Sequence, residues 1–291
     1  MRTGTEERAW QCRDRRIPLA RTQVMGIVNV TPDSFSDGGQ WFDADLAVAH
    51  GLDLVAEGAD LLDVGGESTR PGAVPVDEAE EMRRVLPVIR RLAGSCGVPV
   101  SVDTRHAAVA RAAAEAGACI VNDVMPFAGD AAMAAVVRET GVGLVAMHMR
   151  GALETMTQNT AYGDVVAEVE MTLQEALAYA DVQGIARERL VIDPGIGFAK
   201  NAAQNVVLLA ATARLARVAP LLVGASRKRF IGELCGEAVA AERVGGSLGC
   251  AVWCALRGAS VVRVHDVKAT RQALTMAWEL ARAEECLNRR G

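Results

Sequence analysis

Apolar residues occur along the chain in short, nearly unbroken runs, and a longer segment of mixed character follows each run. The runs are rich in Val, Leu and Ile and do not alternate with polar residues. This pattern is typical of strands that are buried on both faces, as in a parallel sheet. We expect strands at residues 24–30, 61–64, 98–102, 120–121, 143–147, 190–192, 221–223 and 261–264.

The segments between these runs place apolar residues at helical spacing, which predicts amphipathic helices. Clear examples are residues 44–57, 77–92, 107–116, 165–183 and 238–257. Asp77 stands where it can cap the start of its helix, and acidic residues follow it in the first turn. Glycines that commonly end helices follow several of the segments, at positions 58, 117, 184 and 258.

Eight strand–helix pairs within roughly 260 residues match the count and size of a TIM (β/α)8 barrel. A doubly wound open sheet is the alternative that periodicity alone leaves open. No Pro/Ser-rich linker divides the chain, so we expect one α/β barrel domain over residues 23–291. Residues 1–22 lie outside the pattern as an N-terminal extension, which either covers the bottom of the barrel or remains mobile.

Composition narrows the class of protein. Hydrophobic residues make up 51% of the 291 residues and aromatics only 4%, so the core must consist of small aliphatic side chains. The net charge of −5 and the lack of a basic stripe argue against binding of nucleic acid. We interpret the basic run at 13–16 as a solvated tail. No window is apolar enough for a membrane span or a secretory signal, so we expect a cytoplasmic protein.

The seven cysteines also indicate a reduced intracellular protein, because their number is odd and no CxxC pair occurs. Cys250 and Cys254 lie one helical turn apart and could share a metal. No further ligand stands at a suitable spacing, so we interpret them as ordinary buried helix residues.

Polar residues follow each predicted strand, at its carboxyl end. In a TIM barrel these ends meet on the face where active sites are built. Any single Asp or Asn there could simply cap the next helix or form a turn. Caps do not explain two cationic strand ends, Ser226-Arg227-Lys228 and Arg263-Val264-His265. The set favours a site for an anionic substrate with a polar heterocycle.

Motifs for other chemistries are missing from the sequence. It contains no GxSxG, no HExxH, no Walker A motif and no dinucleotide-binding glycine fingerprint. Covalent catalysis and nicotinamide chemistry are therefore unsupported.

Eight ordered motifs at the eight strand ends resemble those of the dihydropteroate synthase family. They read MGIVNVTPDSFSDGG at 25–39, GGESTRPGA at 65–73, SVDT at 101–104, NDV at 122–124, MHM at 147–149, DPGIGF at 193–198, SRK at 226–228 and RVHDV at 263–267. The resemblance runs from about residue 22 to 280. It implies a TIM barrel that joins p-aminobenzoate to 6-hydroxymethyl-7,8-dihydropterin pyrophosphate in folate biosynthesis. The implied products are 7,8-dihydropteroate and pyrophosphate, the implied cofactor is Mg²⁺, and the implied assembly is a homodimer.

The resemblance also implies roles for individual residues. The pterin ring would be bound by Asp103, Asn122, Met147, Asp193, Phe198 and Lys228. The pyrophosphate would be held by Asn29, Thr69, Arg70, Arg263 and His265, with Asn29 also contacting Mg²⁺. The p-aminobenzoate pocket would comprise Phe35, Thr69, Pro71, Phe198 and Arg229. Asp103, Lys228, Arg263 and His265 would be the catalytic residues.

Two rival functions fit part of the pattern. A methyltetrahydrofolate:corrinoid methyltransferase shares the pterin-binding barrel, but it has no need of the anion-binding residues Thr69-Arg70 and Arg263-Val264-His265. A pterin-binding protein without turnover would be expected to have damaged loops at 31–39 or 65–73, and both are intact. The chain departs from the family at Ala199, where Gly is usual, and at Arg229, where Ser is frequent. Residues 125–127, Met-Pro-Phe, are also unusual.

Overall fold

The computed structural model describes residues 8–31, 40–68, 76–127 and 129–289. Within them, eight parallel strands follow the sheet order β8-β7-β6-β5-β4-β3-β10-β9. Their bounds are β3 (Gln23–Asn29), β4 (Leu61–Gly65), β5 (Val100–Asp103), β6 (Ile120–Asp123), β7 (Gly143–Met147), β8 (Leu190–Asp193), β9 (Leu222–Val223) and β10 (Val261–Val264). The predicted strands are therefore confirmed.

The two edges of this sheet meet. Ile192 of β8 pairs with Leu221, next to β9, in a single parallel bridge, and the Ile192 amide donates to the carbonyl of Pro220 at 2.9 Å. The sheet therefore forms a nearly closed barrel. This confirms the predicted (β/α)8 class and excludes the open-sheet alternative.

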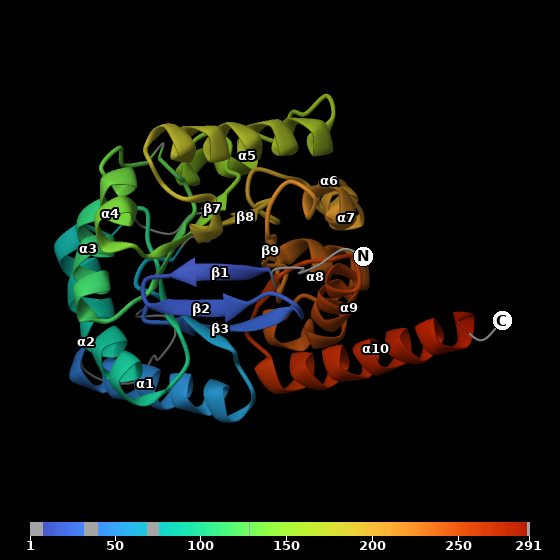
Figure 1. Cartoon of the computed structure of the whole chain (residues 1–291), viewed down its shortest axis with the longest axis horizontal. Coiled ribbons are helices and arrows are strands. Elements are labelled where there is room, and N and C mark those ends of the chain that lie inside the picture. The colour runs from blue at the N-terminus through green and yellow to red at the C-terminus, as the bar shows by residue number, and fades with distance from the viewer. Residues whose placement is uncertain (1–7, 32–39, 69–75, 128, 290–291) are drawn as a thin grey trace, which may run out of the picture.

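Helices surround the barrel (Figure 1). They are α1 (Gln40–Ala56), α2 (Glu78–Ser95), α3 (Ala107–Ala116), α4 (Met133–Thr140), α5 (Val165–Val182), α6 (Ala202–Ala210), α7 (Thr212–Leu215), α8 (Arg229–Cys235), α9 (Val244–Ala255) and α10 (Val267–Asn288). Asp77 caps α2 as expected, because its side chain accepts from the amide of Glu80. No helix among these is long and apolar enough to cross a membrane.

One predicted helix is shorter than expected. Residues 238–257 form a short 3-10 turn, Ala240–Glu242, followed by α9. The guanidinium of Arg243 donates to the carbonyls of Glu237 and Ala238. These carbonyls are therefore bound by a side chain rather than by backbone amides of a continuing helix.

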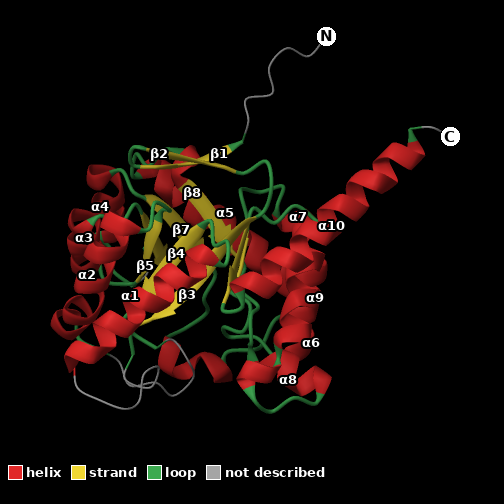
Figure 2. Ribbon diagram, turned by 90° about the horizontal axis from the view of Figure 1, so that it is seen from below, coloured by secondary structure: helices red, strands yellow, loops and turns green. Residues whose placement is uncertain are grey.

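The N-terminal extension covers the bottom of the barrel. Strands β1 (Ala9–Cys12) and β2 (Arg15–Pro18) form an antiparallel hairpin across that end (Figure 2). Trp10, fully buried, packs with the first residues of the barrel strands, and its indole nitrogen donates to the carbonyl of Arg189 at 2.8 Å. The hairpin fits closely, because a Cβ on Gly143 would lie 2.5 Å from the Cys12 sulfur. The alternative of a mobile extension is excluded for residues 8–20.

The basic run at 13–16 belongs to the β1–β2 hairpin, so the prediction of a tail was wrong, although Arg13, Asp14 and Arg16 are exposed to solvent as expected. Arg13 lies in the hairpin turn with φ of 57° and donates to the carbonyls of Ala114 and Ala118, at 2.6 and 3.3 Å. Arg15 donates to the carbonyl of Gly97. The arginines thus bind carbonyls at the C-terminal ends of α2 and α3, where cations are favourable.

Candidate active site

The carboxyl ends of the strands bring charged and polar side chains together at the other end of the barrel. The register pairs Gly65 with Asp103 and Asp103 with Asn122, so consecutive strands end at nearly the same height. Met147 pairs with Asp193 across β7 and β8 in the same way. Parallel strands therefore place residues from distant parts of the sequence around one mouth, as predicted.

Arg263 of β10 is held by two carboxylates from across the barrel. Its Nε donates to Oδ2 of Asp63 at 2.6 Å, and one of its terminal nitrogens donates to Oδ2 of Asp103 at 2.8 Å. The amide nitrogen of Asn122 donates to the same Asp63 oxygen at 3.0 Å. Asp63, which is fully buried, thus joins Asn122 to Arg263, and Arg263 joins both to Asp103. A guanidinium held at both Nε and a terminal nitrogen has a fixed orientation.

Burial shifts the protonation equilibria of this cluster toward neutrality. It raises the pKa of Asp103 to about 7, with Asp63 and Glu67 adding to the rise and Arg263 opposing it. Burial lowers the pKa of Lys228 to about 8, although the charge of Asp193 opposes that shift. The pKa of Asp193 is raised by burial as well. Clustered shifts of this kind are typical of functional sites.

The loop after β8 positions both Asp193 and Lys228. Oδ1 of Asp193 accepts from the amide of Gly195 at 2.7 Å. The Lys228 ammonium donates to the carbonyl of Ile196 and lies 4.6 Å from the centroid of the Phe198 ring. These five residues therefore form one side of the mouth.

His265, directly after β10, lies beside Ser226 at another part of the mouth. Nδ1 of His265 lies 3.1 Å from the Ser226 hydroxyl, and the His265 amide donates to the same oxygen. Arg227 does not take part, because its guanidinium forms a two-pronged ion pair with Asp266. Of the two cations in the Ser-Arg-Lys motif, Lys228 is the one that contacts the β8 loop.

The structure does not bring every predicted site residue together. Asn29 ends β3, beside Gly65 of β4, and Met147 is buried at the end of β7. Arg229 begins α8 with its side chain 74% exposed and paired with Glu233. Its predicted role in the p-aminobenzoate pocket stays a prediction. Four further candidates, Phe35, Thr69, Arg70 and Pro71, lie outside the described residues.

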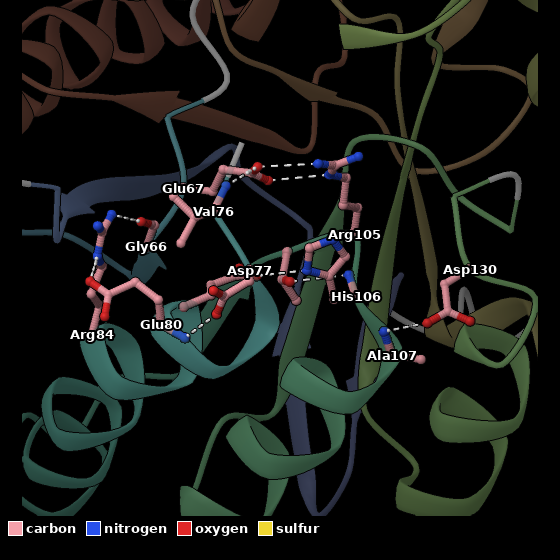
Figure 3. Close-up of polar contacts among 12 residues, drawn as sticks. Gly66, Glu67, Val76, Asp77, Glu80, Arg84, Arg105, His106, Ala107 and Asp130 are labelled. Atoms are coloured by element: carbon pink, nitrogen blue, oxygen red, sulfur yellow. Dashed lines mark hydrogen bonds and ion pairs between the residues drawn. The ribbon is translucent and has the colours of Figure 1, made fainter. Parts of the chain in front are cut away.

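A second tier of polar residues, to which the sequence motifs assign no ligand role, lies behind the strand ends. Glu67 accepts from Arg105 through both carboxylate oxygens at 3.2 Å and from the amide of Val76 (Figure 3). On α2, the fully buried Glu81 lies 3.1 Å from Nδ1 of His106, and burial raises its pKa to about 7. Asp63 is visible in the sequence as a charged residue of the second predicted strand, but its partners Asn122 and Arg263 are not.

Two residues at which the chain differs from the usual family sequence have a left-handed backbone. Ala199 adopts φ of 48° and Phe127 φ of 62°. The left-handed region favours Gly, which explains why Gly is the usual residue at position 199. The ring of Phe127 packs against Tyr179, with centroids 4.8 Å apart. Neither departure removes one of the polar contacts described above.

Comparison with known proteins identifies the family. Residues 25–265 match the profile of the family described as "Pterin binding enzyme". A curated dihydropteroate synthase from Neisseria meningitidis serogroup B is 47% identical over 276 residues, which cover 93% of this chain and 96% of that protein. The chain belongs to the dihydropteroate synthase family. Its predicted function, a transferase reaction of folate biosynthesis, is thereby confirmed.

Solved structures of dihydropteroate synthases agree with the fold. The Xanthomonas albilineans enzyme with 4-aminobenzoic acid has a TM-score of 0.89 and 49% identity, covering 95% of this chain and 99% of that one. The same enzyme in complex with 7,8-dihydropteroate has a TM-score of 0.85 and 48% identity, covering 94% and 99%. Neither the corrinoid methyltransferase nor the pterin-binding protein without turnover is needed to explain these similarities.

Proposed function

We propose that the charged mouth of the barrel binds the dihydropterin ring among Asp103, Asn122, Asp193 and Lys228, with the pyrophosphate against Arg263 and His265. One observation carries this proposal. Side chains from β4, β5, β6 and β10 are joined by direct hydrogen bonds through Arg263 and Asp63. A dihydropteroate synthase needs ring-binding and anion-binding groups side by side, and the bonds that join Asp103 and Asn122 to Arg263 support such an arrangement.

The residue types suit the ring. A pterin carries an edge of adjacent N–H donors, which a carboxylate such as Asp193 accepts in a paired fashion. Asn122 can donate and accept against the ring, and Lys228 can donate to its carbonyl. The Met147 and Phe198 side chains offer apolar surface for the ring faces. The charged groups then determine orientation, and the apolar groups contribute most of the buried area.

The cations suit the leaving group. The bond between the pterin methylene and the pyrophosphate oxygen breaks, and the pyrophosphate gains charge as it departs. Arg263 and His265 oppose that charge, which stabilises the transition state more than the ground state. The amine nitrogen of p-aminobenzoate forms the new bond to the methylene, and the proton that it then loses passes to the departing pyrophosphate or to water. A neutral arylamine is nucleophilic, so no strong protein base is required.

The residues present fit a Mg²⁺ ion that arrives with the substrate. The described residues contain no group of three or more His, Cys, Asp or Glu side chains that could hold a metal ion. Mg²⁺ commonly uses one or two protein ligands together with substrate phosphates and water. Asn29, at the end of β3, would supply its amide oxygen. When bound, the ion would neutralise charge on the departing pyrophosphate.

We also propose that the enzyme is a homodimer of the cytoplasm. Large apolar side chains that are 42–66% exposed lie on α9 and α10, namely Trp253, Leu256, Met276 and Leu280. Exposed apolar surface of this kind supports self-association. Sedimentation at micromolar concentration is expected to show a dimer, and a monomer would contradict this part of the proposal.

Replacement of Asp193 tests the ring site. Asp193→Asn replaces one of the two acceptor oxygens by an amide N–H donor. This donor would then face the N–H donors of the pterin edge. We expect a loss of about 2–4 kcal/mol of pterin binding. Calorimetry with the bare pterin measures it. The matched control is Asp123→Asn, since Asp123 is another buried carboxylate at a strand end and accepts from the Met125 amide. Wild-type affinity in a folded Asp193→Asn protein would remove Asp193 from the site.

Replacement of Arg263 separates the anion site from the ring site. Because Arg263 also neutralises Asp63 and Asp103, Arg263→Lys is preferable to Arg263→Ala, which leaves two buried carboxylates unpaired. Arg263→Lys is expected to weaken binding of the pterin pyrophosphate by about tenfold, since the paired geometry is lost. Binding of the bare pterin should change far less. Equal losses for both ligands would contradict the assignment.

A further inference from the structure

Lys200 is a buried lysine to which neither the motifs nor the proposed reaction assigns a role. It follows the β8 loop and is only 6% exposed. Its ammonium lies 3.0 Å from the carbonyl of Gly195, 2.9 Å from that of Phe198 and 3.0 Å from Nδ1 of His148. Burial lowers the pKa of Lys200 to about 7, although the charge of Asp193 opposes that shift. In its protonated form the amine has three donors, and these three acceptors satisfy it completely.

The loop that Lys200 holds has an unusual backbone. Three of its five residues are left-handed: Gly195 at 66°, Gly197 at 82° and Ala199 at 48°. For a residue with a Cβ, such as Ala199, that conformation costs about 1–2 kcal/mol. The loop also lies directly against the chain after β7, because a Cβ on Gly195 would be 2.0 Å from the carbonyl oxygen of His148. The loop therefore depends on its anchors.

The side chains of Asn205 and Lys200 both form hydrogen bonds with the loop. Asn205 of α6 accepts from the amide of Gly197 at 2.7 Å. Lys200 binds two loop carbonyls and links them to His148 on the neighbouring strand end. Asn205 ties the loop to its own helix, whereas Lys200 is the residue that ties it to β7.

The imidazole of His148 is suited to this contact. Burial, together with the charge of Lys200, lowers the pKa of His148 to about 3. The ring is therefore neutral and can present an unprotonated Nδ1 as an acceptor, which places its proton on Nε2. A protonated ring at this position would repel the ammonium.

The loop in turn determines the positions of two groups at the pterin site. Its Ile196 carbonyl accepts from the Lys228 ammonium, and its Phe198 ring lies against that ammonium. Its Gly195 amide donates to Asp193. A change in loop shape therefore moves Asp193, the acceptor for the ring, and Lys228, the donor to the ring, together.

We propose that Lys200 is a positioning residue for the synthase reaction, which fixes the loop at 195–199 in the shape that aims Lys228 and Asp193 at the pterin. The inference rests on the pterin site proposed above. Lys200 does not touch the substrate in this account and acts through the loop. Errors of about 1 Å in such placement are known to cost about a hundredfold in rate.

The test uses Lys200→Met, which keeps the chain length and removes every donor. Lys200, Lys228 and Lys268 are the only lysines in the chain, so the exposed Lys268 provides a matched control as Lys268→Met. With lysine side chains labelled at Cε, the Lys228 resonance can be followed directly in each variant. Calorimetry with the bare pterin and steady-state kinetics complete the set.

In Lys200→Met we expect the pterin Kd and the KM for pterin pyrophosphate to rise at least about tenfold. The KM for p-aminobenzoate should stay within about twofold, and the Lys228 resonance should move. Lys268→Met should match wild type in all four. A folded Lys200→Met protein with unchanged pterin Kd and an unmoved Lys228 resonance would overturn the inference, even if its melting temperature falls.

Two further measurements keep the result decisive. If Lys200→Met does not fold, His148→Leu removes one of the three acceptors, and the pterin Kd should rise about threefold; an unchanged Kd would overturn the inference. Asp193→Asn, measured alongside, separates the two proposals. Loss of pterin binding in Asp193→Asn but not in Lys200→Met refutes the positioning role alone, whereas retention in both refutes the pterin site itself.

Discussion

The two ends of the barrel are built on opposite principles. At the bottom, Trp10 and Cys12 of the hairpin pack against apolar strand residues such as Met25 and Leu61. At the top lie Asp63 within β4, Asp103 at the end of β5 and other charged or polar residues that are largely withdrawn from water. The same strands therefore begin in a close-packed apolar plug and end in a buried electrostatic network.

This difference separates stability from function. At the bottom, burial of apolar side chains and the hydrogen-bonded indole of Trp10 stabilise the folded state. The top contains buried carboxylate oxygens without a hydrogen-bond partner among the described residues: Asp63 Oδ1, Asp123 Oδ2 and Glu81 Oε1. Such groups lower stability but orient charges in advance of substrate binding, which is the usual compromise at an active site.

Truncation of the plug should give the largest effect on stability. Trp10→Ala removes a fully buried indole, and we expect about 3–5 kcal/mol less free energy of unfolding. Urea denaturation measures the loss. Trp253→Ala, at a partly exposed indole, should cost clearly less. If the two ends are independent, the folded Trp10→Ala protein keeps its pterin affinity; a parallel loss of affinity would break the comparison.

The buried carboxylate Glu81 should give an effect of intermediate size that depends on pH. Its folded pKa is raised to about 7 by burial, so its contribution is present below pH about 4.5 and is lost as pH rises through 7. Glu81→Gln lacks this titration. The free energy of unfolding should therefore fall by about 1–3 kcal/mol more in wild type than in Glu81→Gln between pH 4.5 and 7.5.

The neighbouring Glu80 provides a control for that measurement. Hydrogen bonds from Arg83 and Arg84 lower its pKa to about 2, so its contribution is present above pH about 4.5 and is lost only as pH falls through 2. Glu80→Gln should leave the slope between pH 4.5 and 7.5 as it is in wild type. Equal slopes for wild type and Glu81→Gln would contradict the account of Glu81.

The hairpin turn should give the smallest effect. Arg13→Met removes the hydrogen bonds to the carbonyls of Ala114 and Ala118, one of which is long, so we expect a loss of about 1 kcal/mol. Thermal denaturation measures it, with unchanged kcat. A loss comparable to that of Trp10→Ala would mean that the turn, rather than the apolar plug, holds the bottom closed.

The fold was predictable because buried parallel strands leave an uninterrupted apolar signal. The same regularity placed Asp103, Asn122, Asp193 and Arg263 at strand ends, and the structure joins Asn122, Asp103 and Arg263 in one network. What escaped prediction depends on contacts between distant segments. Lys200 and His148 are 52 residues apart, and Asp63 and Arg263 are 200 apart. No local pattern indicates that such residues meet.

The separation of the two ends is tested most directly by one paired measurement on Trp10→Ala and Asp193→Asn. For each variant, the free energy of unfolding and the pterin Kd of the folded protein are determined under the same conditions. We predict that Trp10→Ala loses stability by about 3–5 kcal/mol and keeps the wild-type Kd. Asp193→Asn should lose about 2–4 kcal/mol of pterin binding, while its free energy of unfolding should fall clearly less than that of Trp10→Ala. Loss of pterin affinity in folded Trp10→Ala, or wild-type affinity in folded Asp193→Asn, would contradict the account.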